Sequence, residues 1–203
     1  MENNRFVRVI AAIDAANARD PNTIEVEGRL EPAELVYGRR MSDTLTRMAP
    51  DASEHLRIAV RGQHIERWTS PRKGYPDGRT GYLQWRKHLA EFHASRVAEL
   101  MAAAGFGADD VARVRSLVRK ERLKSDAEAK MLEDVACVVF LEHYLGAFMT
   151  KTGEEKLAGI LAKTWNKMSP LGHEHALRLV LPPRVPVLLQ QGLARLRTRV
   201  DRT

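Results

Sequence analysis

The stretch Leu132–Phe148, which reads LEDVACVVFLEHYLGAF, decides the fold because it is the most apolar segment of the chain. On a helix, at about 100° per residue, one stripe collects Met131, Asp134, Val138, Leu141, Leu145 and Phe148. Asp134 is the only polar member of that stripe. A carboxylate on a buried face must be ion-paired, hydrogen-bonded, metal-bound or neutralised. The partner of Asp134 is therefore the question that the rest of the sequence has to answer.

Helical periodicity recurs along the whole chain and is interrupted by Gly and Pro. The pattern predicts helices over 5–19, 32–48, 52–68, 82–104 and 109–121, a central helix opened by a capping box at Ser125–Glu128, and helices over 156–168, 173–181 and 185–200. Thr23–Leu30 could form a short strand or a loop, and we favour the loop because no second strand is evident to pair with it. We therefore expect an all-α, single-domain bundle of about eight or nine helices over residues 1–203, in which 182–203 forms a peripheral C-terminal helix.

Composition bounds the class of protein. The 203 residues are 44% apolar, enough for one substantial core, and carry a formal net charge of +7. That charge suits an anionic ligand such as a nucleotide, a phosphoester or a nucleic acid, although arginines spread along the chain are equally typical of a generally basic surface.

Cys137 is the single cysteine, so no intramolecular disulfide can form. No apolar run is long enough to span a bilayer and the first twenty residues lack a secretory pattern, so we expect a cytoplasmic protein with no membrane partner.

Three predicted helices each place one potential metal ligand on or near a core-facing stripe. These residues are His64, His93 and Asp134. Two imidazoles and one carboxylate suit a divalent transition metal (Mn, Fe, Co, Ni or Zn) with open positions for water and substrate, and the metal would turn a bound water into a nucleophile. The alternative is a core in which each His is hydrogen-bonded and Asp134 pairs with an arginine.

Basic and acidic side chains near these positions complete the candidate site. Arg61, Arg67, Lys120 and Lys163 are candidates for phosphate contact. Glu66 and Glu121 are candidates for proton transfer. The alternative for the lysines is a solvated face.

Several motifs in one order carry a family resemblance. They are ELVYGRRMSDTL, IAVRGQHIERW, GYLQWRKHLAEFHA, LEDVACVVFLEHY and KTWNKMS. Together they resemble the family called domain of unknown function 4202, over about Phe6 to Leu181. That resemblance implies no particular activity.

A more distant resemblance is to the HD superfamily of metal-dependent phosphohydrolases, whose helical core holds metal with a His, a His-Asp pair and a later Asp. IAVRGQHIERW is similar to the helix of the pair, which would put His64 at its His, and AEAKMLEDVACVVFLE is similar to the helix of the last ligand, which would put Asp134 there. However, Ile65 stands where the paired Asp belongs, and Leu35–Leu45 contains no His. The resemblance therefore implies either a site rebuilt around His64, His93 and Asp134, or an HD-like core that has lost its metal and keeps an arginine-rich pocket.

Three functions follow as expectations. The first is an HD-like metal-dependent phosphohydrolase that acts on a small phosphorylated substrate such as a nucleotide. The alternative is a non-catalytic helical protein that binds an anion or nucleotide at a degenerate HD-like site. Nucleic-acid binding is favoured least, because no recognised binding motif occurs and aromatic content is only 6%.

Overall fold

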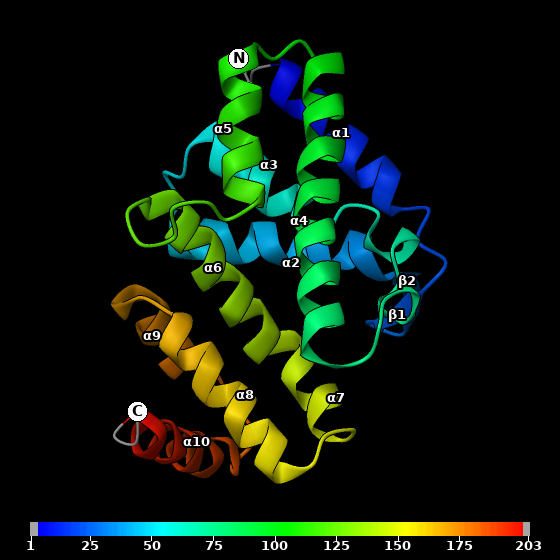
Figure 1. Cartoon of the computed structure of the whole chain (residues 1–203). Coiled ribbons are helices and arrows are strands. Elements are labelled where there is room, and N and C mark those ends of the chain that lie inside the picture. The colour runs from blue at the N-terminus through cyan, green and yellow to red at the C-terminus, as the bar shows by residue number, and fades with distance from the viewer. Residues whose placement is uncertain (1–3, 201–203) are drawn as a thin grey trace. The chain divides into compact units, whose positions relative to one another are not determined.

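The computed structural model describes residues 4–200, and the side chains of residues 4–198 (Figure 1). Within that range the chain forms ten α-helices and one two-stranded sheet, which confirms the predicted all-α class. The chain divides into two compact units, Met1–Leu132 and Glu133–Thr203. Each unit is described by itself below. A compact unit need not fold alone, so the predicted single domain with a peripheral helix at 182–203 stays a prediction.

The first unit is a cluster of helices with a small hairpin at one side. Its elements are α1 (Asn4–Asn17), β1 (Thr23–Val26), β2 (Arg29–Pro32), α2 (Ala33–Met48), α3 (Glu54–Gly62), α4 (Gly78–Ala103), α5 (Ala108–Val118) and the start of α6 (Ala127–Val139). Helix α3 packs against α1, α2 and α5, and α4 runs beside α5 and contacts α1 (Figure 1). The apolar side chains of α3 lie at the centre of this core, where Ile58, Ala59 and Val60 are fully buried.

Gly62 allows the end of α3 to meet α4 closely. A Cβ atom at position 62 would lie 2.5 Å from Cγ2 of Val97, which is on α4. A larger residue would force the two helices apart. The close approach brings the residues that follow α3 against α4, where His93 lies.

Helix α3 is shorter than the sequence predicts. Ser53 is the N-cap of this helix, because its hydroxyl accepts a hydrogen bond from the Leu56 amide. The helix ends at Gly62 instead of continuing to Trp68, so His64 lies in the turn that follows α3. Glu66 has a positive φ of 50°, which a right-handed helix cannot contain. The apolar periodicity continues past Gly62, and therefore gave no sign of this turn.

The predicted loop at Thr23–Leu30 is wrong, because the segment forms a β-hairpin. Strands β1 and β2 pair antiparallel, with Val26 opposite Arg29. The two residues between them, Glu27 and Gly28, both have positive φ, as a type I′ hairpin turn requires. The second strand, Arg29–Pro32, overlaps the predicted helix over 32–48 at Pro32.

The second unit contains the rest of the central helix and three further helices. Its elements are α7 (Leu145–Met149), α8 (Glu154–Lys167), α9 (Pro170–Leu177) and α10 (Val185–Val200). Helix α10 packs along α8 (Figure 1), and Gly192 permits the contact, because a Cβ atom there would lie 2.1 Å from the carbonyl oxygen of Ala158. In the part of the chain that the structure describes, no helix is both long and apolar enough to cross a membrane.

The central apolar stretch is not a regular α-helix throughout. Between α6 and α7, residues Phe140–Tyr144 form a π-helical turn. Such turns are rare and usually occur as single insertions within α-helices. The stretch that decides the fold therefore contains a local change of helical geometry that its composition does not reveal.

Candidate site: a cationic pocket with two neutral histidines

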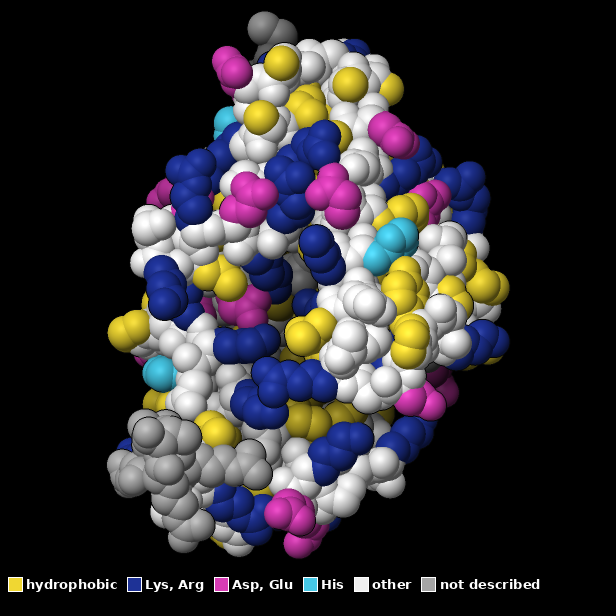
Figure 2. Space-filling view, in the orientation of Figure 1, with side chains coloured by type: hydrophobic (Ala, Val, Ile, Leu, Met, Phe, Trp, Pro, Cys, Tyr) yellow, Lys and Arg dark blue, Asp and Glu magenta, His cyan; other side chains and the backbone are white. Residues whose placement is uncertain are grey.

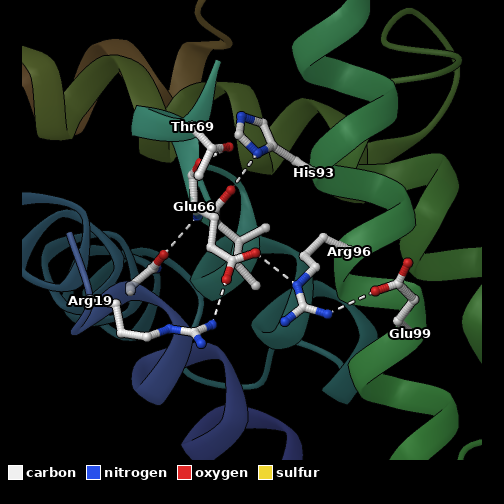
Figure 3. Close-up of polar contacts among 8 residues, drawn as sticks. Arg19, Glu66, Thr69, His93, Arg96 and Glu99 are labelled. Atoms are coloured by element: carbon white, nitrogen blue, oxygen red, sulfur yellow. Dashed lines mark hydrogen bonds and ion pairs between the residues drawn. The ribbon is translucent and has the colours of Figure 1, made fainter. Parts of the chain in front are cut away.

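His93 is the most deeply buried polar side chain of the candidate site, with 3% of its surface exposed. Its Nδ1 lies 2.8 Å from the carbonyl oxygen of Ile65 (Figure 3). A carbonyl oxygen only accepts hydrogen bonds, so Nδ1 carries the proton and Nε2 carries a lone pair. Among the described residues, Nε2 has no hydrogen-bond partner. Burial lowers the pKa of His93 to about 3, although the bond to Ile65 opposes this shift, so the imidazole is neutral near pH 7.

His64 lies beside His93 and is also neutral. The two ring centroids are 5.9 Å apart, and the His64 ring stacks on Tyr37 with centroids 4.1 Å apart. Nε2 of His64 is 3.4 Å from Nη1 of Arg67, which can only donate, so this nitrogen is the acceptor. Burial, followed by the charge of Arg67, lowers the pKa of His64 well below its usual value.

Glu34 and Arg67 lie on either side of the His64 ring. Oε2 of Glu34 is 3.5 Å from Nδ1 of His64. Burial raises the pKa of Glu34 from 4.5 to about 7, against the opposite effect of Arg67. The Arg67 guanidinium lies 4.9 Å from the ring centroid of Trp85, and burial lowers its pKa while Glu34 opposes that change. Glu34 is therefore a weak counter-charge near neutral pH, because a large fraction of it is protonated.

These side chains border a small cavity of about 70 Å³, which we call the cationic pocket. Its lining consists of Gln63, His64, Arg67, Arg86, Leu89, Ala90, His93, Val118, Arg119 and Lys120. Four of these residues are cationic, and the lining contains no Asp or Glu among the described residues. Oε1 of Gln63 is a second buried atom without a hydrogen-bond partner in the described chain. The pocket thus combines excess positive charge with two unsatisfied acceptors.

Two backbone turns with unusual geometry border this pocket. Glu66 and Lys120 both adopt the left-handed region, with φ of 50° and 56°. Non-glycine residues in this region are held there by their surroundings and are common at binding sites. The amide of Glu66 donates to Oδ1 of Asn17, and its carboxylate pairs with Arg19 and Arg96 (Figure 3). These contacts hold the turn that carries His64 against α4.

The structure brings four of the predicted site residues together. His64, Arg67, His93 and Lys120 all line the cationic pocket. The predicted acids have other contacts, because Glu66 pairs with Arg19 and Arg96 and the exposed Glu121 pairs with Arg119. Neither lines the pocket, and their predicted role in proton transfer stays a prediction.

Arg61 and Lys163, both predicted to contact phosphate, also lie outside the lining. The Arg61 guanidinium makes two hydrogen bonds of 2.6 Å to the carboxylate of Asp14, which joins α3 to α1. Lys163 belongs to the second unit, where it is exposed and borders a different hollow between α8 and α10. Arg61 therefore has a clear packing role, and phosphate contact by either residue stays a prediction.

Asp134, the carboxylate in the apolar stripe, belongs to the second unit and is 1% exposed. Its two oxygens accept hydrogen bonds from the amide and the hydroxyl of Ser169, the residue that caps α9. Gly172 packs directly on this carboxylate, since a Cβ atom there would lie 2.8 Å from Oδ1. The sequence left Asp134 to be ion-paired, hydrogen-bonded, metal-bound or neutralised. The structure shows hydrogen bonds, and both come from a residue of the same unit.

Comparison with known proteins identifies the family. The family described as Domain of unknown function (DUF4202) matches residues 7–189, which is most of the chain. The chain belongs to the DUF4202 family. No curated protein and no solved structure matches the chain significantly. The DUF4202 match confirms the first resemblance drawn from the motifs, and the link to the HD superfamily stays a prediction.

The residues of this DUF4202 chain do not fit a divalent metal at the cationic pocket. Within the described residues, no three His, Cys, Asp or Glu side chains are grouped so that they could hold an ion. His64 and His93 are neutral and could each offer a nitrogen lone pair to a metal ion. However, the nearby positive charges of Arg67 and Arg86 oppose the binding of a cation. Metal binding stays a prediction from sequence, and no step below depends on it.

Sequence reasoning missed several residues of the pocket. Gln63 and Arg119 line it, and Glu34 lies behind His64. Arg86, which also lines the pocket, was visible in the sequence beside the His93 stripe, because it precedes His93 by two helical turns on α4. Gln63 and Arg119 lie at helix ends, where the helical period no longer predicts which way a side chain points.

Proposed function

We propose that this protein binds a small anion through a phosphoryl group in the cationic pocket. The observation that supports it is the lining itself: four cationic side chains surround one cavity of about 70 Å³ without a carboxylate among the described lining residues. A compact tetrahedral anion matches such a cavity better than an extended ligand does. Arginine is well suited to this role, since its planar fork donates two parallel hydrogen bonds to phosphate oxygens.

The members of the cluster contribute differently. Arg67 is held by its stacking on Trp85, so its direction is set before a ligand arrives. Arg119 already pairs with Glu91 and Glu121, which reduces its share of the attraction. Arg86 is exposed on α4 and lies close enough to Arg67 to lower the pKa of that guanidinium. An anion between Arg67 and Arg86 would relieve their repulsion, and we assign these two residues the main role in binding.

The proposal concerns binding and assigns no hydrolytic step. The phosphohydrolase expected from the sequence needs a metal ligand set, and the residues of the pocket do not fit one. Nucleic-acid binding gains no particular support, because Lys and Arg side chains are spread over the face shown in Figure 2 with Asp and Glu among them. A cytoplasmic location is part of the same proposal, and the single cysteine supports it.

Isothermal titration calorimetry with inorganic phosphate, pyrophosphate and AMP tests this function. We expect saturable binding that weakens at least tenfold in Arg67→Gln and in Arg86→Gln. The matched control is Arg57→Gln, which removes the same charge from an exposed position outside the pocket. No binding of any of the three anions, or equal weakening in the control, would refute the proposal.

A second arm addresses the metal. Binding should be unchanged after passage of the protein and buffer over a chelating resin. Loss of phosphate binding on chelation, with recovery on adding Zn²⁺ or Mn²⁺, would overturn the metal-free pocket and favour the phosphohydrolase alternative.

A further inference from the structure

The tautomer of His93 determines which group of a ligand can face it. His93 is one of the residues that line the pocket, and because its Nδ1 donates to the Ile65 carbonyl, its Nε2 carries a lone pair and no hydrogen. That nitrogen is buried and lacks a partner among the described residues. Because the pKa of His93 is lowered to about 3, Nε2 does not become a donor by protonation near neutral pH.

A fully deprotonated oxyanion does not suit this acceptor. Sulfate offers only lone pairs, so an oxygen placed against Nε2 of His93 would leave two acceptors facing each other in a buried site. Such an unmade hydrogen bond opposes binding. Hydrogenphosphate has nearly the same size and charge, but one of its oxygens carries a hydrogen that can be donated to Nε2.

The cationic residues cannot make this distinction. Arg67, Arg86 and Lys120 donate hydrogen bonds, and every oxygen of either anion can accept them. Attraction by these charges is therefore similar for two tetrahedral dianions. Selectivity must come from accepting atoms of the lining residues, and the two of these that lack a partner within the described chain are Nε2 of His93 and Oε1 of Gln63.

Building on the proposed function, we propose that the cationic pocket selects oxyanions that carry a hydroxyl hydrogen over those that carry none, with Nε2 of His93 accepting the hydrogen bond from that hydroxyl. The ligand class is then hydrogenphosphate or a singly protonated phosphate monoester. A monoester dianion, which has lost its last hydrogen, belongs with sulfate among the poor ligands.

Two pairs of inorganic anions test the selectivity at constant ionic strength. At about pH 8, phosphate and arsenate carry one hydroxyl hydrogen, whereas sulfate and selenate carry none. Calorimetry on the full chain should show phosphate and arsenate binding at least tenfold more tightly than sulfate and selenate. His93→Gln introduces an amide that can donate to any oxygen, so this ratio should fall toward one. The control is His88→Gln, an exposed histidine of α4 outside the pocket, in which the ratio should stay as in the wild type.

A second measurement needs no variant at His93. In protein labelled with ¹⁵N, the Nε2 resonance of His93 should shift on titration with phosphate and stay in place on titration with sulfate. The sulfate arm separates direct hydrogen bonding from a general effect of charge.

The outcomes separate this inference from the proposed function. If neither anion binds, the proposed function fails. If phosphate and sulfate bind equally well to the wild type, the pocket binds anions but the selectivity is wrong. If the preference for phosphate persists fully in a folded His93→Gln protein, with no shift of Nε2 in the wild type, the role given to His93 is wrong.

Discussion

Replacing Glu34 by Gln should remove a large pH dependence from the stability of this protein. Glu34 has a pKa of about 7 in the folded chain and an ordinary value of 4.5, and its side chain is only 17% exposed. The folded state therefore binds this proton more tightly than the unfolded state does. The contribution of Glu34 to the free energy of unfolding is consequently fully present below pH 4.5 and is lost as the pH rises through about 7.

The size of this effect follows from the two pKa values. A difference of about 2.5 pKa units corresponds to about 3 kcal/mol when the whole range is crossed. Between about pH 5 and about pH 8, the loss through Glu34 is about 2.5 kcal/mol. Gln has nearly the same shape and no ionisable group, so the variant should not show this loss.

The assay is urea unfolding, followed by circular dichroism, of the wild type and Glu34→Gln at both pH values. We expect Glu34→Gln to gain about 2.5 kcal/mol relative to the wild type between pH 5 and pH 8. Glu25→Gln is the control, because Glu25 is an exposed residue of β1 and should show no comparable gain. Parallel stability curves for Glu34→Gln and the wild type would refute the raised pKa, and a gap that opens toward acid pH would show that its direction is wrong.

Three further predictions concern residues whose contacts stabilise the interior of a single unit. Asp134→Asn should lower the free energy of unfolding by about 2 kcal/mol, since it weakens two charge-assisted hydrogen bonds from Ser169; a double-mutant cycle with Ser169→Ala should show strong coupling, and additive effects would contradict this pairing. Gly192→Ala should cost about 1–3 kcal/mol in urea unfolding, because its Cβ atom would meet a backbone carbonyl of α8; unchanged stability would show that α10 does not pack there. Arg61→Gln should lower the free energy of unfolding by about 3 kcal/mol, because Asp14 loses its bidentate partner. Calorimetry should nevertheless find the phosphate affinity of the folded protein within about twofold of the wild type. A much larger loss of affinity would show that Arg61 belongs to the binding site.

Local patterns explain why most of the fold could be predicted. The Ser53 cap, the Gly and Pro interruptions and the apolar stripes are signals within a few residues, and α10 begins and ends where the sequence predicts. The hairpin was missed because its turn depends on the positive φ of Glu27, a residue type that rarely adopts that conformation.

The site could be predicted only in part, for a related reason. A polar residue on an apolar stripe is visible in the sequence, and this made His93 a candidate. The partner of such a residue is often distant, as for Asp134 and Ser169, which are 35 positions apart. Hydrogen bonds of this kind depend on how helices pack, and no spacing rule within one helix encodes them.

The π-helical turn at Phe140–Tyr144 bears on how this chain tolerates changes in length. A π turn holds one residue more than the α turn that it replaces, so it is what a helix becomes when a single amino acid is inserted without displacing either flank. Deleting one residue from this segment should restore a plain α-helix while α7 keeps its rotational setting. The same deletion a few residues earlier, within α6, would turn every later side chain of the helix by about 100°. The helix thus contains one place where a codon can be lost from the gene without moving the buried face of Leu145 and Met149.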